Sequence, residues 1–344
     1  MAKVFTTIID LGIVVGVDDF FDLRPPIGED WEVTELASSV SSGATIDQVP
    51  ELEAGLLTDA ALAAGGVPAL IRFSGIDLAG AECNTRGWFG KTSIFINNTC
   101  YLRLVNVEAG AIQVAATIRL AKSYGPTGRS SVVSDVRVLA GAIATPIIPP
   151  AGQDQVLTDV GSSVWTGGGG NVLNYPNITI DITEAGNLAT VANGLNARGW
   201  QKPFELHMNN TSYVTLTPAG AATIGWSAFI TKEYGPNGAS SVITRTRIVP
   251  VGTNVIIQPP PGEEWEITDI GCDAAFSGIG APDDTPTVLV TLQDLAGRVA
   301  IAQIAGASKG WTGEMRYFLN ETNWMVLTAV NLDIVGVSGI RHRA

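Results

Sequence analysis

One pattern recurs three times along this 344-residue chain, and it limits the folds that the chain can adopt. In each occurrence a Gly-Trp pair precedes, by about ten residues, an Asn-containing turn and then an aromatic residue. The pairs are Gly87-Trp88, Gly199-Trp200 and Gly310-Trp311, and the turns are at Asn97-Asn98, Asn209-Asn210 and Asn320-Glu321. Both landmarks advance by the same step from one copy to the next, so the chain is a triplicated domain.

Two further sets of strings place the boundaries of the copies. RPPIGEDWEVTEL from Arg24, IPPAGQDQVLTDV from Ile148 and QPPPGEEWEITDI from Gln258 align without gaps. YGPTGRSSVV from Tyr124 and YGPNGASSVI from Tyr234 each lead into the next Pro-Pro string, so their SSV segments open the following copy. We therefore divide the chain into unit 1 (1–126), unit 2 (127–236) and unit 3 (237–344), each the size of one domain with its own core.

The local pattern within each unit is that of consecutive strands. Trp31–Leu36 and Trp265–Ile270 alternate apolar residues with acidic or hydroxyl residues, as half-buried antiparallel strands do. The Asn pairs suit the centre of a type I′ hairpin, and Leu52, Leu56, Leu57 and Ala60 suggest one short amphipathic helix. About eight strands per unit predict an all-β fold of three tandem antiparallel β-sandwiches of the jelly-roll kind.

Composition and charge exclude several classes of protein. With 46% hydrophobic and 15% charged residues, the chain lies far from the composition of disordered proteins. A net charge of -13 argues against nucleic acid as a partner, because affinity for phosphates comes from Lys and Arg. No apolar run is long enough to span a membrane. The apolar amino terminus is interrupted by Asp10 and lacks a cleavage site, so we expect a strand there and no signal peptide.

Residues for catalysis are scarce. His207 and His342 are the only histidines, and neither recurs between units. Asp77 and Asp294 share a position in Asp-x-Ala-Gly turns, where turn chemistry explains them. The clusters Asp18-Asp19 with Asp22, Glu29-Asp30 and Asp283-Asp284 could bind Ca²⁺, but we favour solvated loop charge. We expect no catalytic residue, no cofactor and no metal, and we expect the protein not to be an enzyme.

The recurring tryptophans are the main candidates for interaction sites. Each follows a Gly and a basic residue, which gives the set Arg86, Trp88, Arg198, Trp200, Lys309 and Trp311. An exposed Trp beside a cation could anchor a partner or stack on a sugar. Alternatively, each indole closes the end of its own sandwich while the basic side chain lies over it. We favour the closing role, and an interface remains the alternative.

The repeated strings resemble a known group of proteins. Pro-Pro-x-Gly-x-x-Trp-x-Ile-Thr-Asp-Ile, followed by Gly-Trp and Phe-x-Asn-Asn-Thr-x-Tyr-Leu, resembles β-sandwich virion proteins of tailed bacteriophages and related viruses, here in a three-copy version. Unit 2 departs from the pattern at Gln155, and unit 3 departs from it at Glu321. The resemblance implies a structural protein of a virus particle, assembled in the host cytoplasm.

Triplication has consequences for assembly. Three similar surfaces in tandem either extend as a rod or close into a ring, and a ring of three would be a pseudotrimer. Our leading hypothesis is a pseudotrimeric capsid decoration, cement or turret component. Its partners would be the major capsid protein, other virion proteins or further copies of itself.

Two alternatives stay open at this point. The chain could be a virion spike or fibre that binds a host receptor or glycan through the loops at 43–66, 167–174 and 278–285. A weaker alternative is a sandwich-fold hydrolase, for which Asp77 would be the residue to substitute.

Overall fold

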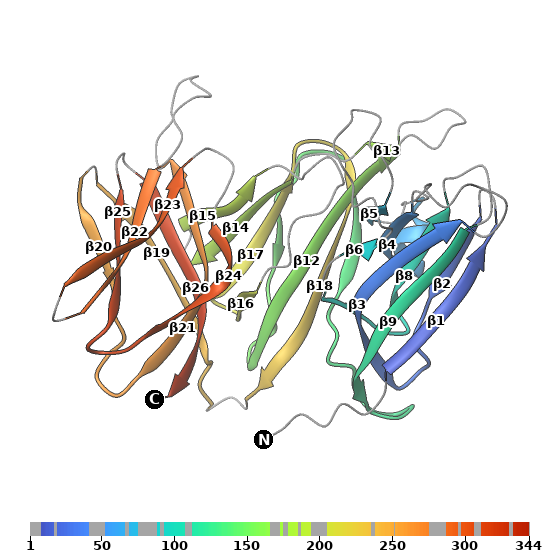
Figure 1. Cartoon of the computed structure of the whole chain (residues 1–344), viewed down its shortest axis with the longest axis horizontal. Coiled ribbons are helices and arrows are strands. Elements are labelled where there is room, and N and C mark those ends of the chain that lie inside the picture. The colour runs from blue at the N-terminus through green and yellow to red at the C-terminus, as the bar shows by residue number, and fades with distance from the viewer. Residues whose placement is uncertain are drawn as a thin grey trace.

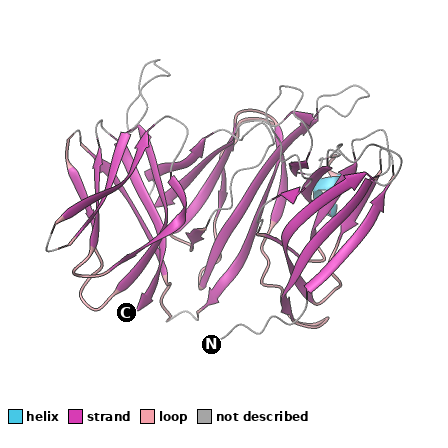
Figure 2. Ribbon diagram, in the orientation of Figure 1, coloured by secondary structure: helices cyan, strands magenta, loops and turns pink. Residues whose placement is uncertain are grey.

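The computed structural model describes most of the three units. The described residues are 8–16, 19–40, 52–65, 69–74, 88–89, 93–106, 112–165, 173–174, 178–184, 187–193, 205–234, 238–250, 252–274, 287–294, 297–305, 311–329 and 333–343. Strands dominate this part of the chain, and its one helix is a single turn (Figure 2). Among the described residues, no helix has the length and hydropathy needed to cross a membrane.

Unit 1 is built from two antiparallel sheets. Its strands are β1 (Ile8–Val15), β2 (Phe20–Leu23), β3 (Glu29–Val40), β4 (Leu52–Thr58), β5 (Ala69–Ser74), β6 (Trp88–Phe89), β7 (Ile94–Ile96), β8 (Cys100–Asn106) and β9 (Ile112–Ser123). One sheet has the order β1-β9-β3, with β6 and β7 both pairing with the far edge of β3. The other sheet has the order β2-β8-β4-β5.

Units 2 and 3 repeat this plan. The strands of unit 2 are β10 (Asp135–Leu139), β11 (Thr145–Ile147), β12 (Gln153–Trp165), β13 (Leu173–Asn174), β14 (Ile178–Glu184), β15 (Asn187–Asn193), β16 (Leu206–Met208), β17 (Ser212–Pro218) and β18 (Ala222–Glu233). The strands of unit 3 are β19 (Val242–Val249), β20 (Asn254–Ile257), β21 (Glu264–Ala274), β22 (Thr287–Gln293), β23 (Arg298–Ala305), β24 (Trp311–Leu319), β25 (Trp324–Ala329) and β26 (Asp333–Arg343).

The sheet order confirms the predicted jelly roll. In unit 3 the sheets are β19-β26-β21-β24 and β20-β25-β22-β23, so the first strand pairs with the last and the second with the next to last. This nested pairing is that of a jelly roll, in which two sheets enclose one core. Each unit has its own cluster of buried apolar residues, represented by Leu36, Leu157 and Ile267 on the long third strand.

The predicted helix in unit 1 is wrong for most of its length. Leu52, Leu56 and Leu57 lie in β4, and the helix α1 (Asp59–Ala63) begins only after Thr58, whose hydroxyl accepts from Ala61 N at 3.1 Å. Ala54 to Leu57 are all buried, because β4 has its own core on one face and strands of unit 2 against the other. A strand buried on both faces has no polar alternation, and its apolar run then looks like that of a helix.

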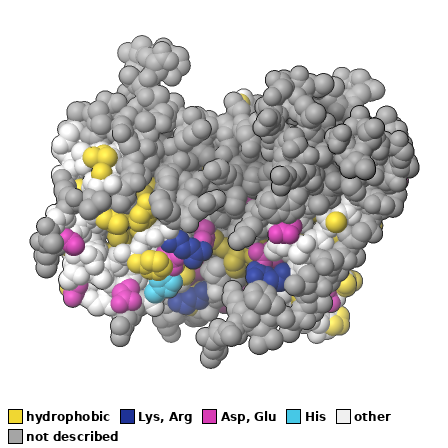
Figure 3. Space-filling model, viewed as in Figure 1, with side chains coloured by type: hydrophobic (Ala, Val, Ile, Leu, Met, Phe, Trp, Pro, Cys, Tyr) yellow, Lys and Arg dark blue, Asp and Glu magenta, His cyan; other side chains and the backbone are white. Residues whose placement is uncertain are grey.

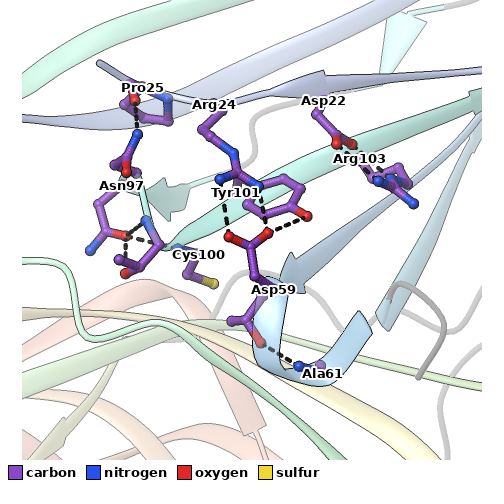
Figure 4. A network of polar contacts seen from close by, with 12 residues as sticks. Asp22, Arg24, Pro25, Asp59, Ala61, Asn97, Cys100, Tyr101 and Arg103 are labelled. Carbon is purple, nitrogen blue, oxygen red and sulfur yellow. Dashed lines mark hydrogen bonds and ion pairs between the residues drawn. The ribbon is translucent and has the colours of Figure 1, made fainter. Parts of the chain in front are cut away.

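The Asn turns differ in detail from the predicted hairpin. Asn97 precedes the turn instead of occupying its centre, and Asn97 N donates to Cys100 O at 2.8 Å. The side-chain oxygen Oδ1 of Asn97 accepts from the backbone N of both Thr99 and Cys100 (Figure 4). Asn209 and Asn320 repeat both bonds, so the residue is retained as a side-chain cap of the turn.

The three units lie in a row. Figure 1 shows unit 2, in green and yellow, between unit 1 in blue and unit 3 in red. Strands of unit 1 pack against unit 2, and strands of unit 2 pack against unit 3. This is the open one of the two arrangements predicted from the triplication, and a closed pseudotrimer is not seen in the described part of the chain.

Candidate interaction surfaces at the joints between units

The SSV segments found in the sequence are anchored to the preceding unit by a buried aspartate. Asp30 lies on β3 of unit 1, and its Oδ1 accepts from Ser130 Oγ at 2.5 Å. Its Oδ2 accepts from Ser131 N at 2.7 Å and from Ser131 Oγ at 2.9 Å. Asn97 Nδ2 also donates to Ser130 Oγ at 3.0 Å. The start of unit 2 is thereby fixed to the third strand and the Asn turn of unit 1.

The same anchor is repeated at the start of unit 3. Asp154 accepts from Ser240 Oγ at 2.5 Å, from Ser241 N at 2.7 Å and from Ser241 Oγ at 2.9 Å. Asn209 Nδ2 donates to Ser240 Oγ at 3.0 Å. Asp30 and Asp154 are fully buried, so the prediction of solvated loop charge at Asp30 is wrong. The burial of these carboxylates is compensated by hydrogen bonds to two serines.

A bulge on the third strand provides the next contact of the first joint, which is the contact between units 1 and 2. The pairing of β12 with β18 shifts register between Leu157 and Asp159, which leaves Thr158 as the extra residue. Thr158 Oγ1 donates to Ser93 O of unit 1 at 2.7 Å. Ser227 Oγ of β18 in turn accepts from Phe95 N at 2.8 Å. Unit 2 thereby satisfies backbone groups on the outer edge of β7, an edge strand that is otherwise open to unwanted pairing.

The second joint, between units 2 and 3, uses equivalent residues. The bulge on β21 leaves Thr268 as the extra residue, and its Oγ1 donates to Glu205 O at 2.7 Å. Ser338 Oγ accepts from His207 N at 2.9 Å. One geometric relation between neighbouring units therefore occurs twice within the chain.

Each joint consists of two faces, which we name here. The edge face belongs to the earlier unit and lies along the strand equivalent to β7, with neighbouring strands of the second sheet. The sheet face belongs to the later unit and is the outer side of the sheet that contains the bulge. The polar sides of Trp31–Leu36 and Trp265–Ile270 lie on this face. Thr268 and Asp269 of unit 3 are buried there, so the predicted half-buried strand is buried on both sides in that unit.

The first joint has an apolar centre. The rings of Phe95 and Phe229 lie 4.2 Å apart between their centroids, and Phe95 is 5% exposed. Val136 of unit 2 packs into the core cluster of unit 1. Aromatic packing of this kind stabilises the joint beyond the burial of area alone.

The second joint has a polar centre. His207 occupies the position of Phe95 and is 6% exposed, and burial lowers its pKa to about 4. Neither ring nitrogen of His207 has a hydrogen-bond partner in the described part of the chain. Arg316 bridges the joint, from Glu205 Oε2 at 2.7 Å to Glu266 Oε1 at 2.9 Å. The imidazole is therefore neutral at pH 7 and enclosed between two units.

A second titratable group is enclosed in the same joint. Asp269 follows the bulge residue on β21, and burial raises the pKa of its carboxyl group to about 7. Nearby, Glu184 of unit 2 contacts unit 3, and its Oε2 accepts from Thr246 N at 2.6 Å. Perturbed pKa values often mark catalytic sites. Here they follow from packing between units, because both side chains are buried in the joint.

The charged network in unit 1 is structural. Arg24 and Asp59 form an ion pair at 2.7 Å, and Tyr101 Oη donates to the same carboxylate at 3.2 Å (Figure 4). Arg24 also lies 3.8 Å above the Tyr101 ring centroid, and its guanidinium lowers the pKa of Asp59. Arg103 and Asp22 form a neighbouring pair at 2.7 Å. Asp22 is thus engaged by an arginine, and the described residues contain no group of three acidic, His or Cys side chains suited to a metal.

The six residues proposed as anchors fall largely outside the described part of the chain. Arg86, Arg198, Trp200 and Lys309 lie outside it. Trp88 is in β6 and Trp311 begins β24, so both are placed on the strand that borders the edge face. Their role as plugs or anchors stays a prediction. Of the acidic positions, Asp18, Asp77, Asp283 and Asp284 also lie outside the described residues.

Sequence reasoning missed the residues that form the joints. Asp30, Asp154 and the paired serines lie in the aligned strings, and Glu264 takes the place of the aspartate in unit 3. The recurrence of the aspartate together with the serine pair was a usable signal. Phe95 and His207 could not be recognised from the sequence as joint residues, because the equivalent positions in the three units hold chemically different side chains.

Comparison with known proteins does not establish the fold or the function of this chain. No family model and no curated protein matches the chain. One similar solved structure is described as "The Triple Jelly Roll Fold and Turret Assembly in an Archaeal Virus", with 10% identity, 97% of this chain and 82% of that chain covered, and a TM-score of 0.21. Another is described as the atomic structure of Sulfolobus Turreted Icosahedral Virus, with 10% identity, 96% and 82% covered, and a TM-score of 0.20. Scores this low establish no shared arrangement, and the jelly-roll assignment depends on the chain's own sheet order.

Proposed function

We propose that this chain is a structural component of a virus particle, of the decoration, cement or turret class. The observation that carries the proposal is the equivalence of the two joints. In each joint, a threonine at the bulge and a serine at equivalent positions form hydrogen bonds to the preceding sandwich. Rigid tandem presentation of similar surfaces suits a protein that binds an array of other proteins. The repeated strings, which resemble those of β-sandwich virion proteins, support the assignment to a particle.

The placement of the titratable groups supports contact over chemistry. His207 and Asp269 have strongly shifted pKa values, yet both are enclosed between units 2 and 3. A general acid or base must come within hydrogen-bond distance of a substrate. Side chains buried in a joint hold two domains together, and they do not offer a reactive surface. The partners we propose are the major capsid protein or other proteins of the shell.

Quantitative mass spectrometry of purified particles tests the proposal. We expect the chain in the particles at a fixed copy number relative to the major capsid protein. Shells stripped of the chain should bind the purified protein again. Absence from the particles, or binding to a glycan array without binding to stripped shells, would overturn the proposal and favour the receptor-binding alternative.

A pair of variants adds a control to the binding assay. Asp154→Ala removes the anchor of unit 3 and leaves its serine donors unsatisfied, so shell binding should fall about tenfold or more if rigid presentation matters. Glu321→Ala alters an exposed side chain in a turn of unit 3 and should leave binding unchanged. Equal binding by both variants would show that the joints do not serve shell attachment.

A further inference from the structure

The two joints leave one unused copy of each face, at opposite ends of the chain. Units 1 and 2 supply their edge faces, and units 2 and 3 supply their sheet faces. Among the described residues, no other unit packs against the edge face of unit 3 or the sheet face of unit 1. Because a joint pairs two different faces, the same contact can be repeated without limit by adding units.

The unused edge face exposes a large aromatic side chain. Phe318 on β24 pairs with Glu266 as Phe95 pairs with Glu32 and His207 with Val156, so it occupies the central position of the joint. Phe318 is 67% exposed, whereas Phe95 and His207 are buried. Figure 3 shows hydrophobic and basic side chains gathered beside a histidine over the area of unit 3. An exposed Phe on an edge strand is typical of a surface that another chain covers.

The unused sheet face has the same hydrogen-bonding groups as the used ones. The bulge between Val33 and Glu35 leaves Thr34 as the extra residue, equivalent to Thr158 and Thr268. Thr34 Oγ1 donates to Thr117 O at 3.1 Å, as Thr158 does to Ser227 O at 3.2 Å. Thr117 supplies a hydroxyl where the joints have Ser227 and Ser338. Thr34 and Thr117 are partly exposed, whereas their equivalents are buried.

The outward side chains of β9 also fit the exposed Phe. Arg119 replaces Phe229, whose ring contacts Phe95 in the first joint, so Phe318 of a second copy would lie against a guanidinium group. Such a pair is favourable through the cation–π interaction. Ala115 is exposed at the position of Gly225 and Gly336, which are buried in the joints. A long side chain at this position would therefore block the contact.

We propose that the chain associates head to tail with a second copy of itself, the edge face of unit 3 binding the sheet face of unit 1 in a third instance of the joint. Phe318 N would donate to Thr117 Oγ1, and Thr34 Oγ1 would donate to Arg316 O. Repetition of the contact produces a linear polymer or a closed ring of chains. The proposal concerns self-association of the isolated protein, so its test does not depend on whether the protein binds a virus shell.

Sedimentation velocity over a range of concentrations tests the proposal with two variants. Phe318→Glu disables the edge face, and Ala115→Arg disables the sheet face. The unaltered chain should form species larger than a monomer as its concentration rises, and each variant alone should remain monomeric. An equimolar mixture of the two variants should form dimers and nothing larger, because each supplies the face that the other lacks.

The mixture distinguishes this contact from other kinds of association. Ile256→Glu is the matched control, since Ile256 is 59% exposed on β20 of unit 3, away from both faces, and this variant should associate like the unaltered chain. Circular dichroism should show that all three variants are folded, because every altered side chain is exposed. A monomeric unaltered chain at all concentrations, a mixture without dimers, or loss of association in Ile256→Glu would overturn the proposal.

Discussion

The two joints of the chain share their hydrogen bonds but differ in what fills the centre. Both use a bulge threonine, a serine hydroxyl and an anchoring aspartate at equivalent positions. The first joint is filled by Phe95 and Phe229, whereas the second contains His207 with Arg316 and Glu205 around it. Hydrogen bonds to the backbone fix the relative orientation of the units, because a hydrogen bond tolerates only a small range of distances and angles. The side chains in the centre then set how stable each joint is and how it responds to pH.

The largest effect should come from removing the aromatic centre of the first joint. Phe95→Ala should weaken that joint by about 4 kcal/mol, since it deletes a buried ring and leaves a cavity. Hydrogen exchange of the peptide around Ser131, whose amide is held by Asp30, reports on opening of the joint. The peptide around Ser241 in the second joint is the internal control. Equal acceleration in both peptides would show that the joints do not open independently.

Acid should loosen the second joint and spare the first. The pKa of His207 is about 4 in the folded chain against an ordinary value of 6.5, so the unfolded chain binds the extra proton between these values. Stability is full above about pH 6.5, and up to about 3 kcal/mol is lost as the pH falls to about 4. The charged groups that influence His207 are Glu266, Arg316, Asp154 and His342.

Substitution of the histidine provides the control for this prediction. Hydrogen exchange of the Ser241 peptide, corrected for the chemical rate, should rise between pH 6.5 and 4 in the unaltered chain. His207→Phe should abolish that rise, because it gives the second joint the aromatic residue of the first. A pH response that persists in His207→Phe would assign the effect to another group.

The buried acid of the second joint should have the opposite pH dependence. The pKa of Asp269 is about 7 in the folded chain and 3.8 ordinarily, so its contribution to stability is lost as the pH rises through 7. Asp269→Asn should therefore stabilise the joint at pH 8, by about 1.5 kcal/mol once the cost of burying the amide is included. Urea denaturation at pH 5 and pH 8 measures the gain. Glu35→Gln, at the half-exposed equivalent position in unit 1, should change little at either pH.

The smallest effect should come from the bulge threonines. Thr158→Val and Thr268→Val each remove one hydrogen bond across a joint and should each cost about 1 kcal/mol. Equal losses of stability would show that the hydrogen bond of the bulge threonine contributes the same free energy in both joints. Thr34→Val is the control in the monomer, because within the described part of the chain the Thr34 hydroxyl donates to Thr117 O of its own unit and to no other unit. A clearly larger loss in one joint would mean that the centre also changes the strength of these bonds.

The jelly roll could be predicted from the sequence because repeated turn motifs mark the ends of its strands. The Pro-Pro-x-Gly strings end one strand and start the next, and Gly28, Gly152 and Gly262 have the positive φ that the turn requires. β4 was missed because both of its faces are buried, which removes the polar alternation that identifies a strand. The turn residue Asn97 was found, but its capping role depends on a side-chain bond that composition does not reveal.

The joints could not be predicted, although most of their residues lie in the repeated strings. A threonine followed by an acidic residue is typical of the solvent-facing side of a strand. In unit 3, however, the neighbouring unit buries Thr268 and Asp269. Burial between domains depends on three-dimensional placement, which a single alternating pattern does not contain. The central residues Phe95, His207 and Phe318 differ chemically, so alignment of the copies hides their common position.

The anchoring of Ser130 and Ser131 by Asp30 bears on how such a chain could have grown. Unit 2 carries both halves of this contact: Asp154 on its third strand, and the pair Ser130-Ser131 in the segment that precedes its first strand. A duplicated copy of such a unit would carry both halves of the contact, so it could dock on its neighbour without a new binding surface. Whole units could therefore be added or removed without a new contact surface, and unit 3 carries Glu264 in place of the anchoring aspartate.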